Sequence, residues 1–368
     1  MSRSIVEILA IAALAVGPAR AADAGWEVAR PGWRYAFPRD HGSHPAFKTE
    51  WWYFTGNLRG DDGREFGYQL TFFRIGVIPP GGKLEATSRF VVRNIAMVHF
   101  AISDLGARKF HFEQLLSRGA YGDAGFGDGG RLAWLDECSL DLGSDGKFRL
   151  IGRAGGQSLD LTLSSIKPPV IHGIDGLSRK ADGPGRASQY YSFTRLATMG
   201  TLGVDGATHS VQGESWFDHE WATNQLGADQ VGWDWLSLQL DDGTDLMLFQ
   251  IRKKNGGTDK WSSGTVISPD GKATHLAASE FTLEPSHVWR SPATAAAYPE
   301  QWHIAIPGSG IDLTATARMA DQELNLRPTA YWEGAISVTG SRSGAPVRGK
   351  GYLEMTGYAG QVTGLKGQ

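Results

Sequence analysis

Residues 211–221 read VQGESWFDHEW, and a related stretch, VRGKGYLEMTGY, occupies residues 347–358. The two stretches align at Gly213 and Gly349, and an aromatic pair precedes each of them, at 190–191 and 331–332. Residues 51–74 and 233–252 are a second pair of similar segments. Both turn at Asp-Asp-Gly and end in a strand whose last residue is arginine. We therefore predict two similar β domains, at 33–221 and 222–360, each large enough to hold its own core.

Asp-Gly dipeptides separate β-rich runs along the whole chain. They lie at 62–63, 145–146, 205–206, 242–243 and 270–271. Asp-Gly between alternating segments is a strong hairpin signal, because both central residues of that turn need a positive φ. Long amphipathic helical segments are scarce, so the pattern predicts an all-β protein made of two tandem barrels.

The composition excludes several functional classes. The chain of 368 residues has 36 Lys and Arg against 39 Asp and Glu, and this net charge of −3 argues against a protein that tracks nucleic-acid phosphates. A single cysteine excludes an intrachain disulfide framework and a multi-cysteine zinc or iron–sulfur site. No Gly-x-Ser-x-Gly elbow is present, which argues against a serine hydrolase.

The first residues have the pattern of an export signal. Arg3 precedes a short apolar run at 8–16, and Ala19-Arg20-Ala21 fits the small-x-small pattern of a signal-peptidase site. The run is too short to span a bilayer permanently. We predict a signal peptide at 1–21 and an exported protein, periplasmic or secreted.

Alternation along 216–221 separates two sets of side chains. On a strand, Phe217, His219 and Trp221 share one face, while Trp216, Asp218 and Glu220 share the other. In the second copy of the repeat Met355 stands where the first copy has His219, so the fold does not require a histidine at this position. His219 is therefore a candidate functional residue, with Asp218 and Glu220 outside the barrel or at a domain boundary.

Four motifs together resemble one protein family. They are KTEWWYFTGNL at 48–58, the strand at 66–74, WFDHEW at 216–221 and GWDW at 232–235. The chain resembles the AttH/CrtC family of lipocalin-like proteins, which includes the carotenoid 1,2-hydratases. The resemblance implies a pair of lipocalin-like barrels, a cavity for a polyene, and a His-x-Trp pair at His219 and Trp221. The family's catalytic carboxylate lies further along the chain, and Asp234 is the nearest candidate.

The residues can be matched to hydration of an alkene. A carboxylic acid kept protonated by apolar surroundings can protonate carbon, and Asp234 between two tryptophans is such a candidate. His219 would orient the acid or the water, and Asp218 and Glu220 are further candidate acids. Aromatic faces would stabilise the cation. The predicted ligand-binding residues are Trp51, Trp52, Tyr53, Trp221, Trp233 and Trp235. This chemistry requires no cofactor, and we predict none.

Other interpretations remain open at this point. Glu50 can pair with Arg74 across a hairpin, and Asp218 and Glu220 can be structural acids where the domains meet. His41, His44 and His99 could join a metal site, but adjacent residues 218–220 point to opposite faces, so we predict no metal. The alternative to an enzyme is a carrier without catalytic activity. The predicted partner is a lipophilic, polyene-like small molecule and not nucleic acid; peripheral membrane contact and the oligomeric state stay open.

Overall fold

The computed structural model describes residues 23, 25–82, 91–326 and 329–360. These residues form two curled sheets with no α-helix, which confirms the predicted all-β, lipocalin-like two-barrel fold. The predicted signal peptide, residues 1–21, lies outside the described residues. No helix among the described residues is long and apolar enough to cross a membrane.

The first sheet takes all its strands from residues 49–222. Its order is β4-β3-β2-β1-β13-β12-β9-β8-β7-β6-β5, and β10 and β11 pair with β12 at the side. The strands are β1 (Thr49–Gly60), β2 (Glu65–Gly76), β3 (Asn94–Asp104), β4 (Lys109–Ser117), β5 (Ala124–Phe126), β6 (Arg131–Leu135), β7 (Cys138–Leu142), β8 (Phe148–Ala154), β9 (Gln157–Ser165), β10 (Val170–Ile171), β11 (Leu177–Arg179), β12 (Ala187–Val204) and β13 (Ala207–Ala222). A 3₁₀ turn, η1 (Arg39–His41), precedes them.

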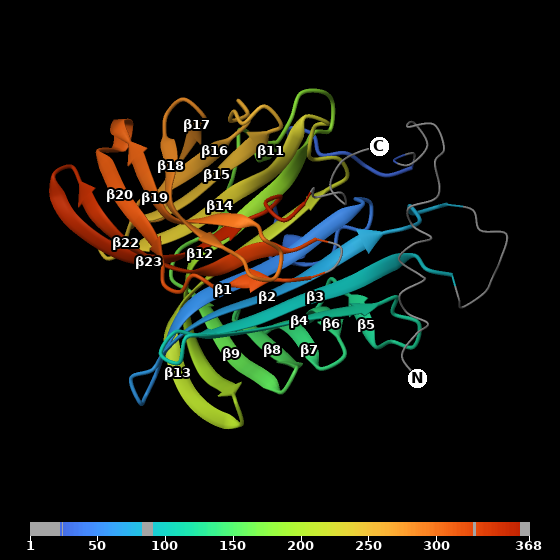
Figure 1. The fold of residues 1–368 in the computed structure, drawn as a ribbon. Coiled ribbons are helices and arrows are strands. Elements are labelled where there is room, and N and C mark those ends of the chain that lie inside the picture. Colours follow the sequence, from blue (N-terminus) through green and yellow to red (C-terminus); the bar gives the residue numbers. More distant parts are fainter. Residues whose placement is uncertain (1–22, 24, 83–90, 327–328, 361–368) are drawn as a thin grey trace.

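The second sheet takes its strands from residues 230–355 and lies above the first in Figure 1. Its order is β17-β16-β15-β14-β23-β22-β20-β19-β18, and β21 pairs with β22. The elements are β14 (Gln230–Leu240), β15 (Asp245–Lys253), β16 (Ser263–Ile267), β17 (Ala273–Ala277), β18 (Thr282–Arg290), β19 (Ala297–Ile306), η2 (Pro307–Ser309), β20 (Ile311–Ala317), β21 (Glu323–Leu324), β22 (Tyr331–Arg342) and β23 (Ala345–Met355).

The repeated stretches occupy matching places in the two sheets. The first forms most of β13, which lies between β1 and β12, and the second forms most of β23, which lies between β14 and β22. Both aligned glycines pack against a neighbouring strand. A Cβ atom on Gly213 would lie 2.2 Å from the Asn57 carbonyl oxygen, and one on Gly349 would lie 2.5 Å from that of Gln239. Only glycine therefore fits at either position.

Three of the four apolar clusters among the described residues organise the molecule. One fills the first sheet and contains Trp52 and Phe217, and a second fills the other sheet and contains Trp332 and Met355. The third draws residues from both sheets, among them Tyr53, Tyr190, Trp216, Trp235 and Tyr352. The two sheets thus pack together through their outer faces, and we call this third region the intersheet layer.

Buried polar contacts also join the two sheets. Asp245 on β15 accepts hydrogen bonds from Lys167 Nζ at 2.6 Å and from Arg195 Nη2 at 2.7 Å, and both cations belong to the first half of the chain. Asp245 and Lys167 are buried. Removing one member would leave a buried charge without its partner, so the arrangement fixes how the sheets pack.

Candidate functional site

The two faces of β13 lead to two different polar groups. Phe217 and Trp221 belong to the core of the first sheet, and His219 packs between them. Trp216 belongs to the intersheet layer, where Asp218 accepts hydrogen bonds. The alternation predicted for residues 216–221 is therefore confirmed, and His219 and Asp218 face different regions.

His219 lies close to the side chains of His44 and Glu50 inside the first sheet. His44 Nδ1 lies 2.7 Å from Glu50 Oε1, and His219 Nε2 lies 3.0 Å from the same oxygen. Asp40 of η1 contacts the ring nitrogen of each histidine that points away from Glu50. Its carboxylate lies 3.3 Å from His44 Nε2, and its backbone carbonyl oxygen lies 3.0 Å from His219 Nδ1. All four residues are buried.

Glu50 and Arg74 form the hairpin ion pair that the sequence suggested. They are direct neighbours in the β1–β2 register, and Arg74 Nε donates to Glu50 Oε2 at 2.9 Å. Burial alone would raise the pKa of Glu50, but hydrogen bonding to His219, the charge and hydrogen bond of His44, and the charge of Arg74 together hold it well below its usual value. Glu50 is therefore ionised.

Aromatic rings enclose this group on both sides. Trp221 stacks on His44 with ring centroids 3.7 Å apart and planes inclined by 4°, and Trp52 stacks on His219 at 4.7 Å. Burial lowers the pKa of His219, although hydrogen bonding to Glu50 opposes the shift. For His44 burial also lowers the pKa, but hydrogen bonds to Asp40 and Glu50 outweigh it and the net pKa is raised.

Asp218 lies on the opposite face of β13, in the intersheet layer. It accepts hydrogen bonds from the Tyr190 hydroxyl at 2.6 Å, from the Ser192 hydroxyl and from the Trp216 indole. Burial outweighs these donors and raises the pKa of Asp218 to about 7. Glu220, on the same face, lies 3.5 Å from Lys180 Nζ.

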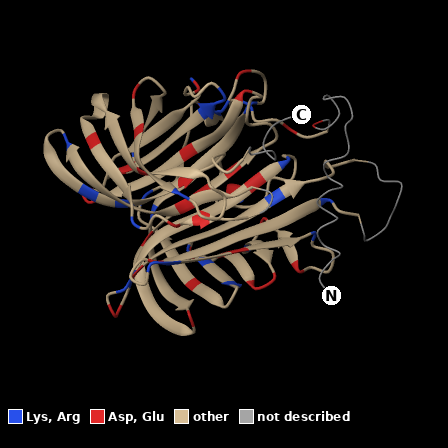
Figure 2. Cartoon of the chain, in the orientation of Figure 1, with Lys and Arg blue, Asp and Glu red and all other residues tan. Residues whose placement is uncertain are grey.

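A second pair of acids enters the intersheet layer from the other sheet. Glu333 on β22 and Glu354 on β23 are direct cross-strand neighbours. The Tyr53 hydroxyl donates to Glu333 Oε1 at 2.6 Å, and the Trp233 indole donates to Glu354 Oε2 at 3.1 Å. Figure 2 shows acidic positions on the strands where the two sheets meet.

These two carboxyl groups titrate above their usual range. Burial, and next the charge of Glu354, raise the pKa of Glu333 well above its usual value. Burial also raises the pKa of Glu354 to about 7. Glu333 is buried, and its Oε2 has no hydrogen-bond partner among the described residues. Glu333 therefore holds its proton to a higher pH than an ordinary carboxylic acid does, which favours it as a proton donor.

Asp234 lies inside the second sheet rather than with either group. It alternates with Trp233 and Trp235, which pack in the intersheet layer, so its side chain points the other way. Arg252 Nε donates to its Oδ2 at 3.0 Å, and burial raises the pKa of Asp234 to about 6. The arrangement parallels the pair of Glu50 and Arg74 in the first sheet.

The predicted site residues therefore fall into three places. His219, Trp52 and Trp221 lie inside the first sheet, and Asp234 lies inside the second. The intersheet layer holds the remaining predicted residues: Trp51, Tyr53, Asp218, Glu220, Trp233 and Trp235.

Glu333 and Glu354 were not predicted as site residues. Ser192 pairs with Asp218 across β12 and β13, as Glu333 pairs with Glu354 across β22 and β23. The repeat therefore contained the signal, because the position of Ser192 in the first copy holds a carboxylic acid in the second.

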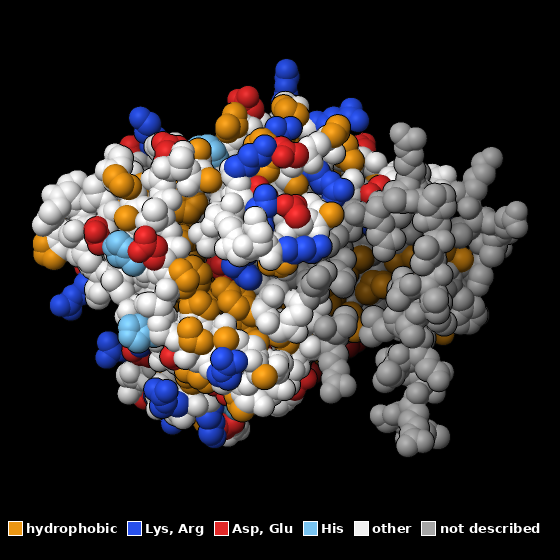
Figure 3. Space-filling model, turned by 45° about the horizontal axis from the view of Figure 1, so that its top comes forward, with side chains coloured by type: hydrophobic (Ala, Val, Ile, Leu, Met, Phe, Trp, Pro, Cys, Tyr) orange, Lys and Arg blue, Asp and Glu red, His pale blue; other side chains and the backbone are white. Residues whose placement is uncertain are grey.

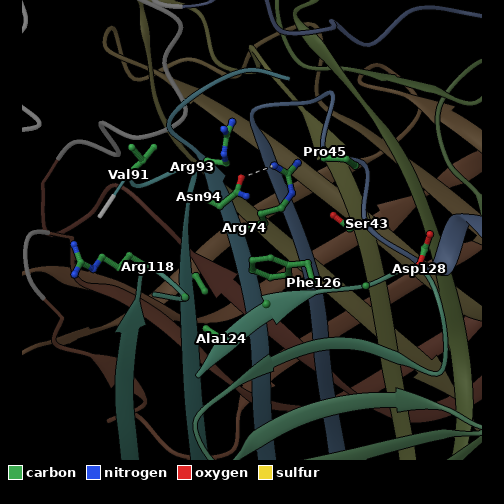
Figure 4. Close-up of a pocket in the computed structure, with 14 residues that line it drawn as sticks. Ser43, Pro45, Arg74, Val91, Arg93, Asn94, Arg118, Ala124, Phe126 and Asp128 are labelled. Atoms are coloured by element: carbon green, nitrogen blue, oxygen red, sulfur yellow. Dashed lines mark hydrogen bonds between the residues drawn. The ribbon is translucent and has the colours of Figure 1, made fainter. Parts of the chain in front are cut away.

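Each of two cavities has a lining residue that packs against one of these regions. One of about 820 Å³ lies between residues 28–31 and 173–187 of the first half and residues 260–263, 275 and 277 of the second. Trp261 lines it and also packs against the intersheet layer. On the face shown in Figure 3, hydrophobic side chains gather in the middle of the molecule. The other cavity, of about 500 Å³, includes Ser43, Arg74 and Phe126 (Figure 4).

Comparison with known proteins agrees with the fold. The structure superposes on that of a protein described as an AttH from Nitrosomonas europaea with a TM-score of 0.81 and 33% identity, covering 90% of this chain and 99% of that one. Kievitone hydratase from Nectria haematococca gives a TM-score of 0.68 at 14% identity, covering 92% and 95%. CghA gives 0.54 at 14% identity, covering 84% and 88%.

At the lower identities the likeness concerns the fold alone. No curated protein matches the chain in a sequence search. The family model described as AttH-like matches residues 28–358, which include both sheets. The chain therefore belongs to the AttH-like family.

Proposed function

We propose that this chain is an exported enzyme that binds an apolar, polyene-like small molecule between its sheets and adds water to an alkene, or removes it. The observation that carries the proposal is the pair of Glu333 and Glu354, which places a buried carboxyl group with a raised pKa and an unpartnered oxygen among aromatic rings. The likeness in fold to kievitone hydratase supports a hydro-lyase.

The proposed reaction uses only protons and water. The Glu333 carboxyl group gives its proton to one alkene carbon, and the π electrons form the new C–H bond. The cation left on the other carbon is stabilised by the faces of neighbouring rings, each by about 0.5–2 kcal/mol. Water then attacks the cation, and its surplus proton returns to a carboxylate of the pair. Tyr53 and Trp233 hydrogen-bond to these acids, and Trp235 is the cross-strand neighbour of Glu354.

A specific observation favours a second candidate, a carrier without catalytic activity. The residues that line the 820 Å³ cavity include Trp261 and Leu177, but neither member of the acid pair. A cavity of this size suits a small apolar ligand. A ligand held there, away from the acids, would be carried and not converted.

The test uses the chain without residues 1–21 and an acyclic carotenoid in detergent. Mass spectrometry of the extracted products should show the gain of one water, and Glu333→Gln should abolish it. Glu323→Gln, which replaces a buried acid on β21 outside the intersheet layer, should retain it. Loss in Asp234→Asn but not in Glu333→Gln would make Asp234 the acid.

Other outcomes decide between the two candidates. A shift of the visible spectrum without a change of mass would support the carrier. The absence of both signals would rule out the carotenoid as the ligand. Export is tested separately, by expressing the full chain in a Gram-negative bacterium. The protein should appear in the periplasm or the medium, with Ala22 as its first residue.

A further inference from the structure

We infer that His44, Glu50 and His219 form a binding site for one divalent transition-metal ion, with zinc as the reference ion. Their ligand atoms all lie within 4.8 Å of one another. Two imidazoles and one carboxylate are a donor set that suits zinc and the neighbouring first-row metals. The three residues come from the segment after η1, from β1 and from β13, so the ion would fasten the N-terminal segment to the sheet.

The distances inside the group fit a shared ion. Ligand atoms that bind one zinc ion at about 2.0–2.2 Å lie roughly 3–3.5 Å from each other. The nitrogens of His44 and His219 lie 2.7 and 3.0 Å from the same oxygen of Glu50. All three ligand atoms lie within 4.8 Å of one another, so a small rearrangement of the two rings would bring them to these separations.

The outer contacts are an independent observation. Histidines that bind metals usually donate their other N–H group to a carboxylate or a backbone carbonyl oxygen. Asp40 offers one of each, its carboxylate to His44 and its carbonyl oxygen to His219. Arg74 and Ser43 hold the second oxygen of Glu50, while Oε1 faces both imidazoles and also accepts the His44 backbone N–H at 3.0 Å.

Proton counting gives a further reason. A neutral imidazole has one N–H group, yet both nitrogens of His44 face carboxylate oxygens, one of Glu50 and one of Asp40. His219 Nε2 faces the same Glu50 oxygen as His44 Nδ1. A cation at the inner nitrogens satisfies these contacts without a buried imidazolium ion at His44. The rival arrangement contains protons only, with the Tyr191 hydroxyl, 3.2 Å from His219 Nδ1, as a donor.

The group is also close to a route from solvent. Ser43 and Arg74 line the 500 Å³ cavity (Figure 4). Both hydrogen-bond to Glu50, Ser43 at 3.3 Å and Arg74 at 2.9 Å. The cavity therefore lies next to the side chains that hold the second oxygen of Glu50.

The test is metal binding by the chain without residues 1–21, stripped with a chelator. Titration with Co²⁺ should give the visible ligand-field bands of a nitrogen- and oxygen-bound ion, with one ion per chain, and Zn²⁺ should displace it and raise the melting temperature. His219→Gln and His44→Gln should abolish the bands. Asp40→Asn should weaken binding by about 10–100-fold, since it disturbs only the outer contact.

The matched control is His99→Gln. His99 is a buried histidine whose ring contacts Tyr331 and Gln114 instead of an acid, so this variant should bind Co²⁺ as the parent chain does. Circular dichroism establishes that each variant is folded. The inference is overturned if the parent chain gives no such bands, or if binding persists in folded His219→Gln and His44→Gln. Because the readout is metal binding, it is independent of the proposed hydration.

Discussion

The Tyr53 hydroxyl on β1 donates a 2.6 Å hydrogen bond to Glu333 on β22, and so one buried contact joins the two sheets. Tyr53→Phe removes the donor and leaves Glu333 without it, which should lower the free energy of unfolding by about 1–3 kcal/mol. Urea denaturation measures this. Tyr121→Phe, at an exposed position, should change nothing. Equal stabilities of the two variants would show that this contact does not hold the sheets together.

Glu333 should also make the protein less stable as the pH rises. Its pKa is raised in the folded chain, so above about pH 4.5 the unfolded chain has lost a proton that the folded chain still holds. The free energy of unfolding therefore falls from about pH 4.5 upward until the folded group ionises. The groups facing Glu333 are Glu354, Asp218, Tyr53, Tyr331 and Tyr352.

Glu333→Gln should flatten this decline while the Tyr53 hydrogen bond remains, because the glutamine oxygen still accepts it. Urea denaturation at pH 5, 6, 7 and 8 compares the slopes of the parent chain and the variant. An unchanged slope would mean that Glu333 is ionised in the folded chain at all these pH values, contrary to its assignment as the proton donor.

The ion pair of Glu50 and Arg74 should contribute far more than a surface pair. Arg74→Met leaves the Glu50 charge buried without this partner, and the expected loss is about 3–5 kcal/mol. The exposed pair of Arg149 and Asp160 has the same 2.9 Å separation, and Arg149→Met should cost about 0–1 kcal/mol. Denaturant unfolding of both variants tests the contrast. Similar losses would show that burial adds nothing here.

Filling the 820 Å³ cavity should weaken ligand binding. Ala277 on β17 lines the cavity and is exposed, so Ala277→Trp adds bulk inside it without disturbing a core. The affinity for a fluorescent polyene should fall by at least about tenfold, or 1.4 kcal/mol. Ala273→Trp, on the same strand but not in the cavity lining, is the control. Equal affinities would place the ligand elsewhere.

Local periodicity allowed much of the fold to be predicted. Alternation along residues 216–221 separated His219 from Asp218, and turn residues predicted the strands around them. The pairing of Glu50 with Arg74 followed from the hairpin at Asp62-Gly63, which sets their register.

The site was harder to predict, because its contacts join distant segments. His44 reaches His219 only after residues 33–47 fold across the end of the first sheet, and no local pattern encodes that path. Alternation placed Asp234 on a face but could not say which face lies toward the other sheet. The acid pair needed a different comparison, that of Ser192 with Glu333 within the repeat.

That comparison has a consequence for how such a protein can evolve. In a symmetric dimer of single barrels, each subunit must present the same side chains at the shared face. Here Ser192 and Asp218 of one half occupy the positions that Glu333 and Glu354 hold in the other. In one fused chain the two copies need not be identical, so one copy can keep a hydroxyl group where the other has a carboxylic acid. An asymmetric contact with more acids on one side can therefore form in a fused chain but not in a symmetric homodimer.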